Sequence, residues 1–184
     1  MPSSTPSGSL PSLLLEKYEV LYQIGEGVHG VVVAAKRKID DLVVAIKAFR
    51  RRDVARWMPD TNREAIPMEI YVTKTFSGHK HIVRYIDHTY HDGYYYLITQ
   101  LYGTPWMTTD VPDNAKGVLA GIPTSTVHCH DLWYYLDQKD VYEADLKKIF
   151  KQVAKAVRTL HRRGFCHGDI KDQVRWYFFF FLLL

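Results

Sequence analysis

The chain has 184 residues, of which 47% are hydrophobic and 24% are charged, and its formal net charge is +4. This composition is ordinary for a globular protein with a hydrophobic core, in one domain or two small lobes, and the mild charge argues against a nucleic-acid-binding protein. The two cysteines form no disulfide framework. We therefore expect a reducing compartment, cytoplasmic or nuclear, and the scattered histidines predict no zinc site.

The N-terminal part of the chain predicts a tail followed by a β-meander. Residues 1–17 begin with a stretch rich in Ser, Pro and Gly, lack the organisation of a secretory signal, and are expected to be disordered. Apolar alternation predicts a strand over Tyr18–Ile24, and a glycine-rich turn over Gly25–Gly30 follows it. Val31–Ala35 and Leu42–Ala48 predict two further strands, so the first hairpin loop of the meander is the glycine-rich one.

The next segment predicts one helix and two more strands. Helical periodicity covers Ile66–Phe76, with a proline suited to the first turn and a glycine soon after the end. Strands are predicted over Ile82–Asp87 and Tyr94–Leu101, joined through a turn that contains Asp92-Gly93. Five strands and one helix form a compact lobe over residues 18–101.

The remaining chain predicts a connector and a helical segment. Residues 102–130 are rich in Pro and Gly and show no period, which indicates a connector with a long insertion, and 131–136 predict a short helix. A longer helix begins at a capping-box-like pair, Asp140 and Glu143, and stops at Gly164. Its apolar stripe comprises Leu146, Ile149, Phe150, Val153, Ala156, Val157 and Leu160.

Three glycines form a G-x-G-x-x-G-x-V string that ends at Val32; they are Gly25, Gly27 and Gly30. A backbone without Cβ atoms can approach a phosphate closely and donate N–H groups to it. Taken alone, a motif of this kind favours a plain hairpin turn over a phosphate-binding loop. The dinucleotide-binding alternative requires a helix directly after the glycines, whereas the β-branched Val31–Val33 predict a strand.

Lys47 closes an apolar strand, fifteen residues after Val32. It is either an edge-strand lysine or a cation for the phosphates of a nucleotide, and in the second case it needs a carboxylate partner. Glu69 on the predicted helix is the candidate, although a glutamate in a first turn also favours the helix dipole. Downstream, Asp169 could accept a proton from a hydroxyl and Lys171 could stabilise a phosphate in transfer.

In this order, the motifs resemble those of a eukaryotic protein kinase, from about Tyr18 to Gln173. Pro67–Ile70 and His167–Asp172 are most similar to the Pim-type and calmodulin-dependent-kinase-like branch, and Lys171 resembles the serine/threonine pattern. The resemblance implies an α+β fold, with a five-stranded antiparallel N-lobe that carries one helix over residues 18–101 and an incomplete helical C-lobe over 131–173. It also implies transfer of the ATP γ-phosphate to protein Ser or Thr hydroxyls, with Mg²⁺.

The resemblance further implies an ATP site and a catalytic pair. The ATP site would comprise Ile24, Val32 and Ala45 in the adenine slot, Gly25, Gly27 and Gly30 over the phosphates, Lys47 with Glu69, Thr99 as gatekeeper, and Gln100 and Tyr102 at the hinge. Asp169 would be the catalytic base, with Lys171 beside it. The protein substrate is not implied, and neither nucleic acid nor a membrane is an expected partner.

The chain departs from the kinase pattern after Asp169. Gly168 replaces the usual Arg, Val174 stands where the metal-binding Asn is expected, and no Asp-Phe-Gly motif follows. We therefore expect a truncated domain with an incomplete Mg²⁺ site and no useful turnover. The apolar tail, residues 174–184, is shorter than the about 20 residues of a membrane span and reads as a translated intron. The alternatives are a non-catalytic kinase-like module that binds a nucleotide or a protein, and a gene-model or splicing artefact.

Overall fold

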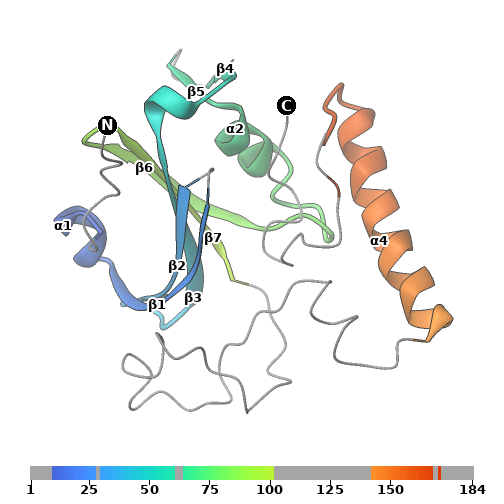
Figure 1. The fold of residues 1–184 in the computed structure, drawn as a ribbon, viewed down its shortest axis with the longest axis horizontal. Helices are drawn as coiled ribbons and strands as arrows, with labels where there is room; N and C mark the ends of the chain where they lie inside the picture. The colour runs from blue at the N-terminus through green and yellow to red at the C-terminus, as the bar shows by residue number, and fades with distance from the viewer. Residues whose placement is uncertain (1–9, 28–29, 61–63, 102–141, 168–169, 171–184) are drawn as a thin grey trace.

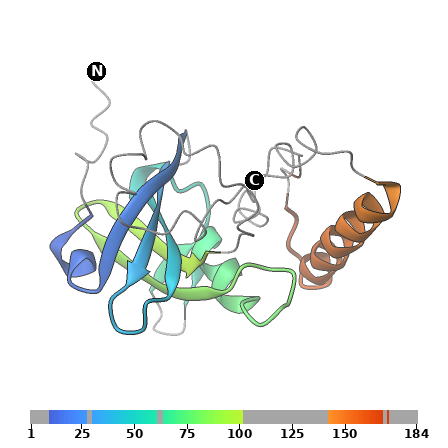
Figure 2. The ribbon, with the colours of Figure 1, turned by 90° about the horizontal axis from the view of Figure 1, so that it is seen from below.

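A five-stranded antiparallel sheet forms the centre of the computed structural model, which describes residues 10–27, 30–60, 64–101, 142–167 and 170 (Figures 1 and 2). The strands, in their order across the sheet, are β1 Tyr18–Gly27, β2 Gly30–Arg37, β3 Val43–Arg50, β7 Tyr94–Gln100 and β6 Tyr85–His91. With helix α2, Met68–Thr75, packed on one face of the sheet, this is the α+β lobe that the sequence predicts. The predicted connector, 102–130, and the short helix, 131–136, lie outside the described residues.

Two local features set the hairpin between β6 and β7. Asp92 and Gly93 connect the strands with φ angles of 46° and 79°, so both take the positive values that a tight two-residue turn needs. The predicted Asp-Gly turn is therefore confirmed. The preceding strand begins at Tyr85 rather than Ile82, because Ile82 donates its N–H to His79 in a turn and is buried with Val83 in the core.

A short second hairpin precedes α2 and was not predicted. It pairs β4, Trp57–Pro59, with β5, Ala65–Pro67, after the 3-10 turn Arg51–Asp53. Helix α2 spans Met68–Thr75 instead of beginning at Ile66, because the two residues before Met68 pair with β4 and are buried. The proline that suits a helical first turn is thus the N-cap residue of α2 and also the last residue of β5.

The expectation of a disordered tail over residues 1–17 is wrong for its second half. Helix α1, Ser12–Leu15, packs beside β1, and its Leu14 is 3% exposed. Lys38 reinforces the contact, since its Nζ donates to the carbonyl of Leu15 at 2.7 Å and its backbone N–H to that of Lys17 at 2.9 Å. The leucine fills an apolar face of the sheet, a tertiary partner that a Ser- and Pro-rich composition does not reveal.

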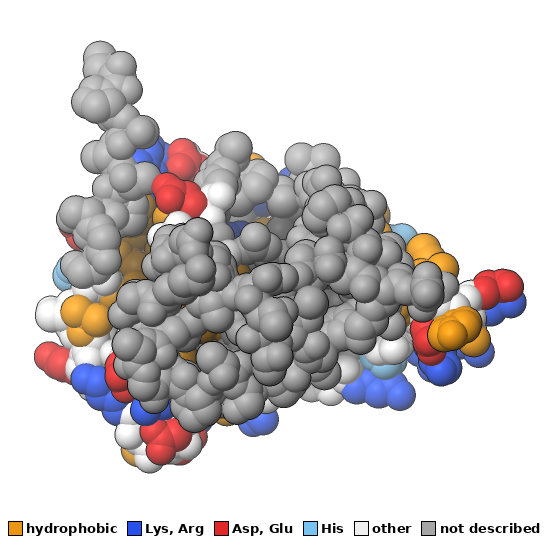
Figure 3. Space-filling view, turned by 60° about the horizontal axis from the view of Figure 1, so that its bottom comes forward, with side chains coloured by type: hydrophobic (Ala, Val, Ile, Leu, Met, Phe, Trp, Pro, Cys, Tyr) orange, Lys and Arg blue, Asp and Glu red, His pale blue; other side chains and the backbone are white. Residues whose placement is uncertain are grey.

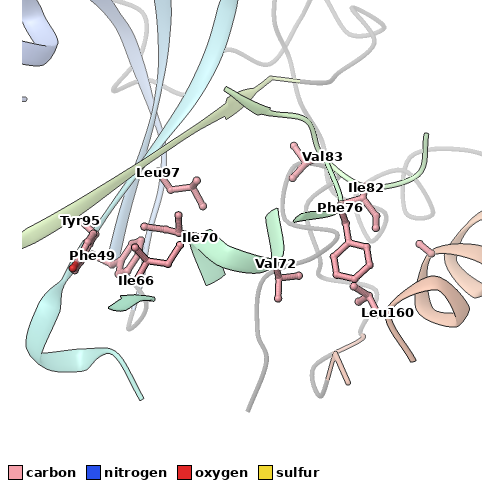
Figure 4. Close-up of a cluster of buried hydrophobic side chains, with 11 residues drawn as sticks. Phe49, Ile66, Ile70, Val72, Phe76, Ile82, Val83, Tyr95, Leu97 and Leu160 are labelled. Atoms are coloured by element: carbon pink, nitrogen blue, oxygen red, sulfur yellow. The ribbon is translucent and has the colours of Figure 1, made fainter. Parts of the chain in front are cut away.

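The sheet has an apolar cluster on each face. The cluster under α1 contains Leu14, Tyr18, Ala35, Val44, Ile46, Ala48, Tyr96 and Ile98. The cluster on the α2 face contains Phe49, Ile66, Ile70, Val72, Phe76, Ile82, Val83, Tyr95, Leu97, Ala156 and Leu160 (Figure 4). Burial of both faces explains why β3 and β7 are almost continuously apolar instead of alternating.

Helix α4, Glu143–His161, lies beside α2 on the side away from the sheet (Figure 1). Its N-cap is Tyr142, without a side-chain capping bond, and the predicted partner Asp140 lies outside the described residues. The predicted stop at Gly164 is confirmed. That glycine has a φ of 79°, its N–H bonds the carbonyl of His161, and the next N–H bonds that of Leu160, which together form a Schellman motif.

The predicted apolar stripe of α4 is buried only toward its C-terminal end. Ala156 and Leu160 are fully buried, and Phe76 of the loop after α2 points toward Leu160 (Figure 4). Phe150 is 65% exposed, and hydrophobic side chains lie among charged ones at the end of the molecule where α4 lies (Figure 3). Within the described parts of the chain, no helix is long and apolar enough to cross a membrane.

His81 provides a test of the contact between the loop after α2 and α4. Its Nε2 atom is buried and has no hydrogen-bond partner among the described residues. Burial, and then the charges of Lys80, His79 and Lys155, lower the pKa of His81 below its ordinary value of about 6.5. The unfolded chain therefore binds this proton more tightly than the folded one. The contribution to stability is fully present above about pH 6.5 and is lost as the pH falls below it.

Urea unfolding at about pH 7.5 and about pH 5.5 measures this effect. The protein is expected to lose stability at the lower pH, and His81→Asn is expected to lose less. His88 will add a remaining pH dependence to both proteins, because burial lowers the pKa of its ring as well. Parallel pH dependences in the two proteins would show that His81 does not carry the effect.

Candidate functional site

A buried ion pair joins the sheet to α2. Lys47 lies in the middle of β3 and is 7% exposed, and its Nζ is 2.6 Å from Oε1 of Glu69 in the first turn of α2. The ammonium is also 5.6 Å from the ring centroid of Phe49. Directly paired residues of adjacent strands point to the same face, and Lys47 is paired with Leu97 of the α2-facing cluster. The strand register therefore directs this lysine toward α2.

Three other predicted site residues share this face of the sheet. Val32 is paired with Lys47, and Ala45 is paired with Thr99, two positions further along β3 and β7. All three are buried, with exposures of 5%, 5% and 7%. The structure thus brings together a small apolar surface, one hydroxyl and one charged ammonium. Such a surface can accept a flat apolar group next to an anionic one.

The two ends of this surface are set by β1 and β7. Ile24 lies where the register between β1 and β2 shifts by one residue, since Gln23 pairs with Val33 and Gly25 already pairs with Val32. At the other end, the N–H of Gln100 donates to the carbonyl of Arg84 at 2.9 Å. Tyr102 lies outside the described residues.

The glycine string forms the hairpin end of β1 and β2, where Gly27 pairs with Gly30. Gly30 has a φ of 112°, and a Cβ added to it would lie 2.1 Å from the carbonyl oxygen of Ala48 in β3. Its place in the motif therefore has a packing reason, because only a residue without a side chain allows the hairpin to approach β3 so closely. This reason is independent of any ligand.

The predicted catalytic residues are not part of the described structure. Both Asp169 and Lys171 lie outside the described residues. The described residues nearest to them in the sequence are His167, which is 4% exposed, and Ile170, which is 53% exposed. Among the described residues, no group of three or more His, Cys, Asp or Glu side chains could hold a metal ion.

Sequence reasoning missed two features of this site. The first is Phe49, whose ring lies near the Lys47 ammonium. The sequence could have indicated this, because residues two positions apart in a strand lie on the same face. The second feature is the ion pair between Lys74 of α2 and Asp60 at the end of β4, which joins two segments 14 positions apart. No local pattern predicts that contact, because it depends on the hairpin that precedes α2.

Comparison with known proteins assigns the same segment to a family. The family model described as "Protein kinase domain" matches residues 18–173. The chain is 31% identical over 158 residues to "Serine/threonine-protein kinase PSK1" and 28% identical over 160 residues to "Serine/threonine-protein kinase PSK2", both of Saccharomyces cerevisiae. These alignments cover 83% and 85% of this chain but only 10% and 13% of the relatives. The chain is also 27% identical to "Serine/threonine-protein kinase pim-2" of Danio rerio, over 86% of this chain and 46% of that protein.

Replacement of Gly30 by alanine tests the packing reason for the third glycine. Gly30→Ala is expected to reduce the free energy of unfolding by about 3 kcal/mol, because the methyl group meets backbone that cannot move freely. Two controls separate crowding from backbone strain. Gly93→Ala places a methyl group on a residue with a positive φ, where the surrounding space is open. Gly78→Ala adds a methyl group in open space at a residue without a positive φ. If urea unfolding shows no larger loss for Gly30→Ala than for Gly93→Ala, close approach to β3 is not the constraint.

Removal of the Glu69 charge tests the energetic role of the buried pair. Glu69→Gln removes the carboxylate that lies 2.6 Å from a buried ammonium and is expected to cost about 3 kcal/mol of stability. Glu143→Gln is a matched control, because Glu143 is also 2.6 Å from a lysine, Lys147, but both side chains are more than 70% exposed. No measurable change is expected there. Equal losses in the two variants, measured by urea unfolding, would contradict the assignment.

Proposed function

The chain belongs to the protein kinase family, and from that premise we propose that it binds ATP on the α2-facing surface of its sheet, as part of a domain that phosphorylates protein Ser or Thr hydroxyls. The observation that carries the proposal is the 2.6 Å contact between Lys47 and Glu69. A lysine with this partner can present its ammonium to the α- and β-phosphates while the carboxylate holds it in place. The relatives are named serine/threonine-protein kinases, which supports the same class of acceptor.

The remaining site residues have distinct roles in this proposal. Ile24, Val32 and Ala45 form the apolar surface for adenine. Thr99 lies at the inner end of that surface, and Gln100 and Tyr102 offer backbone groups to the base. The hairpin of Gly25, Gly27 and Gly30 covers the phosphates with N–H groups.

Phosphoryl transfer also requires groups beyond this surface. Asp169 would accept the proton of the attacking hydroxyl, and Lys171 would stabilise charge on the transferred phosphate. The family uses Mg²⁺ to neutralise the triphosphate, and an Asn side chain supplies one of its ligands. Val174 occupies that position in this sequence and has no atom that can ligate a metal. We therefore infer that this polypeptide binds nucleotide but transfers phosphate poorly.

The second candidate function is a non-catalytic kinase-like module that binds a nucleotide or a protein. It is favoured by two residues near the predicted catalytic base, Gly168 in place of Arg and Val174 in place of Asn. A module that binds a nucleotide shares the Lys47 site with the first candidate, and it differs in belonging to a domain without phosphoryl transfer. The proposed location, a reducing compartment that is cytoplasmic or nuclear, is the same for both.

Nucleotide binding and turnover are measured on the full chain. Calorimetric titration with ATP is expected to give binding that Lys47→Met weakens at least about tenfold, since a charge-assisted contact with phosphate is lost. Lys148→Met is the control, because this lysine is 73% exposed on α4. Unchanged affinity in Lys47→Met would contradict the proposed site.

Transfer of labelled phosphate to a basic protein substrate is the second measurement. The chain is expected to give no transfer above the level of Lys47→Met. Transfer that Lys47→Met abolishes would show a working enzyme and would contradict the inactivity that we infer from Val174.

A further inference from the structure

The β4–β5 hairpin contacts α2 near both ends of the helix. At the N-terminal end, Met68 donates its backbone N–H to the carbonyl of Arg56 at 3.0 Å, next to the paired Trp57 and Pro67. At the C-terminal end, Nζ of Lys74 lies 3.0 and 2.9 Å from the two carboxylate oxygens of Asp60. The hairpin therefore lies along the helix instead of touching it at one point.

These two contacts bracket the residue that binds Lys47. Met68 and Lys74 are six positions apart, which is about 9 Å along a helix axis, and Glu69 follows Met68 directly. Helix α2 has only eight residues, so its orientation depends on tertiary contacts and not on its own stability. Ile70 and Val72 fix its buried face in the core. Apolar contacts are non-directional, however, and allow small rotations and shifts, whereas a charge-assisted contact at the end of the helix favours one position of that end.

The Asp60–Lys74 pair lies where three elements meet. Asp60 closes the hairpin end through its N–H, which donates to the carbonyl of Glu64 at 2.9 Å. The charge of this carboxylate also acts on Tyr85 at the start of β6, since burial, and then the charges of Asp87 and Asp60, raise the pKa of Tyr85 to about 12. The Asp60 side chain is 13% exposed and that of Lys74 is 37% exposed, so the pair is screened less than the ion pairs on the surface of α4.

We infer that Asp60 and Lys74 are positioning residues, whose ion pair holds α2 against the hairpin and thereby keeps Glu69 within reach of Lys47. This inference rests on the proposed function, in which the Lys47 ammonium is presented to ATP. Neither residue contacts that ammonium, so both act through α2. Loss of the pair moves Glu69 away from Lys47, so the carboxylate no longer orients the ammonium toward the phosphates.

The first measurement follows Lys47 itself, without nucleotide. In protein labelled at lysine, the ammonium protons of a buried, ion-paired lysine exchange slowly and give a visible magnetic-resonance signal, assigned by its loss in Lys47→Met. Asp60→Asn and Lys74→Met are each expected to weaken this signal, as Glu69→Gln does directly. Asp145→Asn is the matched control, because Asp145 forms an Asp–Lys pair of the same 2.9 Å length on the surface of α4.

The second measurement is ATP affinity. Each single variant is expected to weaken binding on the order of fivefold, the lower end of typical couplings between sites. The double variant is expected to weaken it no further, because both changes break one pair. Reversal of the charges, Asp60→Lys with Lys74→Asp, is expected to restore part of both the affinity and the signal, which a loss of general stability does not allow.

The outcomes separate the inference from the proposed function. If Asp60→Asn and Lys74→Met lower the melting temperature but leave the Lys47 signal and the ATP affinity unchanged, the pair is only structural and the inference is wrong. If the parent chain binds no ATP while its Lys47 signal still responds to Asp60→Asn, the proposed function fails and the positioning role stands. If one variant does not fold, the other single variant and the charge reversal decide.

Discussion

A lysine ammonium buried against the sheet requires a counter-charge, and much of this fold is arranged so that Glu69 supplies one. Lys47 is surrounded by apolar neighbours on β2, β3 and β7, where an unpaired charge is strongly unfavourable. The carboxylate comes from a helix that is too short to hold its own orientation. The sheet register, the core under α2 and the hairpin before α2 therefore all help to set one distance, that between Nζ of Lys47 and Oε1 of Glu69.

The glycine hairpin illustrates how one residue satisfies two constraints. Gly30 lies over the backbone of Ala48, so the meander closes only if this position lacks a side chain. The same absence of Cβ atoms along the string allows close approach of a phosphate in the function that we propose. A spacing of glycines that is typical of nucleotide binding is thus partly a requirement of β-sheet packing. The glycine motif indicates nucleotide binding only in combination with Lys47, which the strand register brings close to it, and with Glu69, which pairs with that lysine.

Among the described residues, helix α4 contacts the rest of the molecule near its C-terminal end. Ala156 and Leu160 pack against the loop after α2, and Thr159 lies 3.1 Å from Nε2 of His79 in that loop. The other half of the helix, with Phe150, is exposed. His81 belongs to the same loop and its Nε2 is buried, so protonation of this ring at mildly acidic pH destabilises the loop.

The sequence by itself determined the number and order of the strands of the central sheet, though not the bounds of β6, as well as the Asp92-Gly93 turn and the stop of α4 at Gly164. Local geometry dictates each of these features, through the period of a strand or the need for a positive φ. It also determined the family, because several motifs occur in a fixed order along the chain.

The tertiary structure alone decided which surfaces meet. Ser12–Leu15 became a helix because Leu14 had a sheet face to fill, and Ile66 and Pro67 joined a hairpin because β4 was there to pair with them. The Asp60–Lys74 contact likewise depends on the path of the chain between β3 and α2. Periodicity states which side of an element is apolar, but long-range packing decides what covers that side, and this information is not contained in any short window of residues.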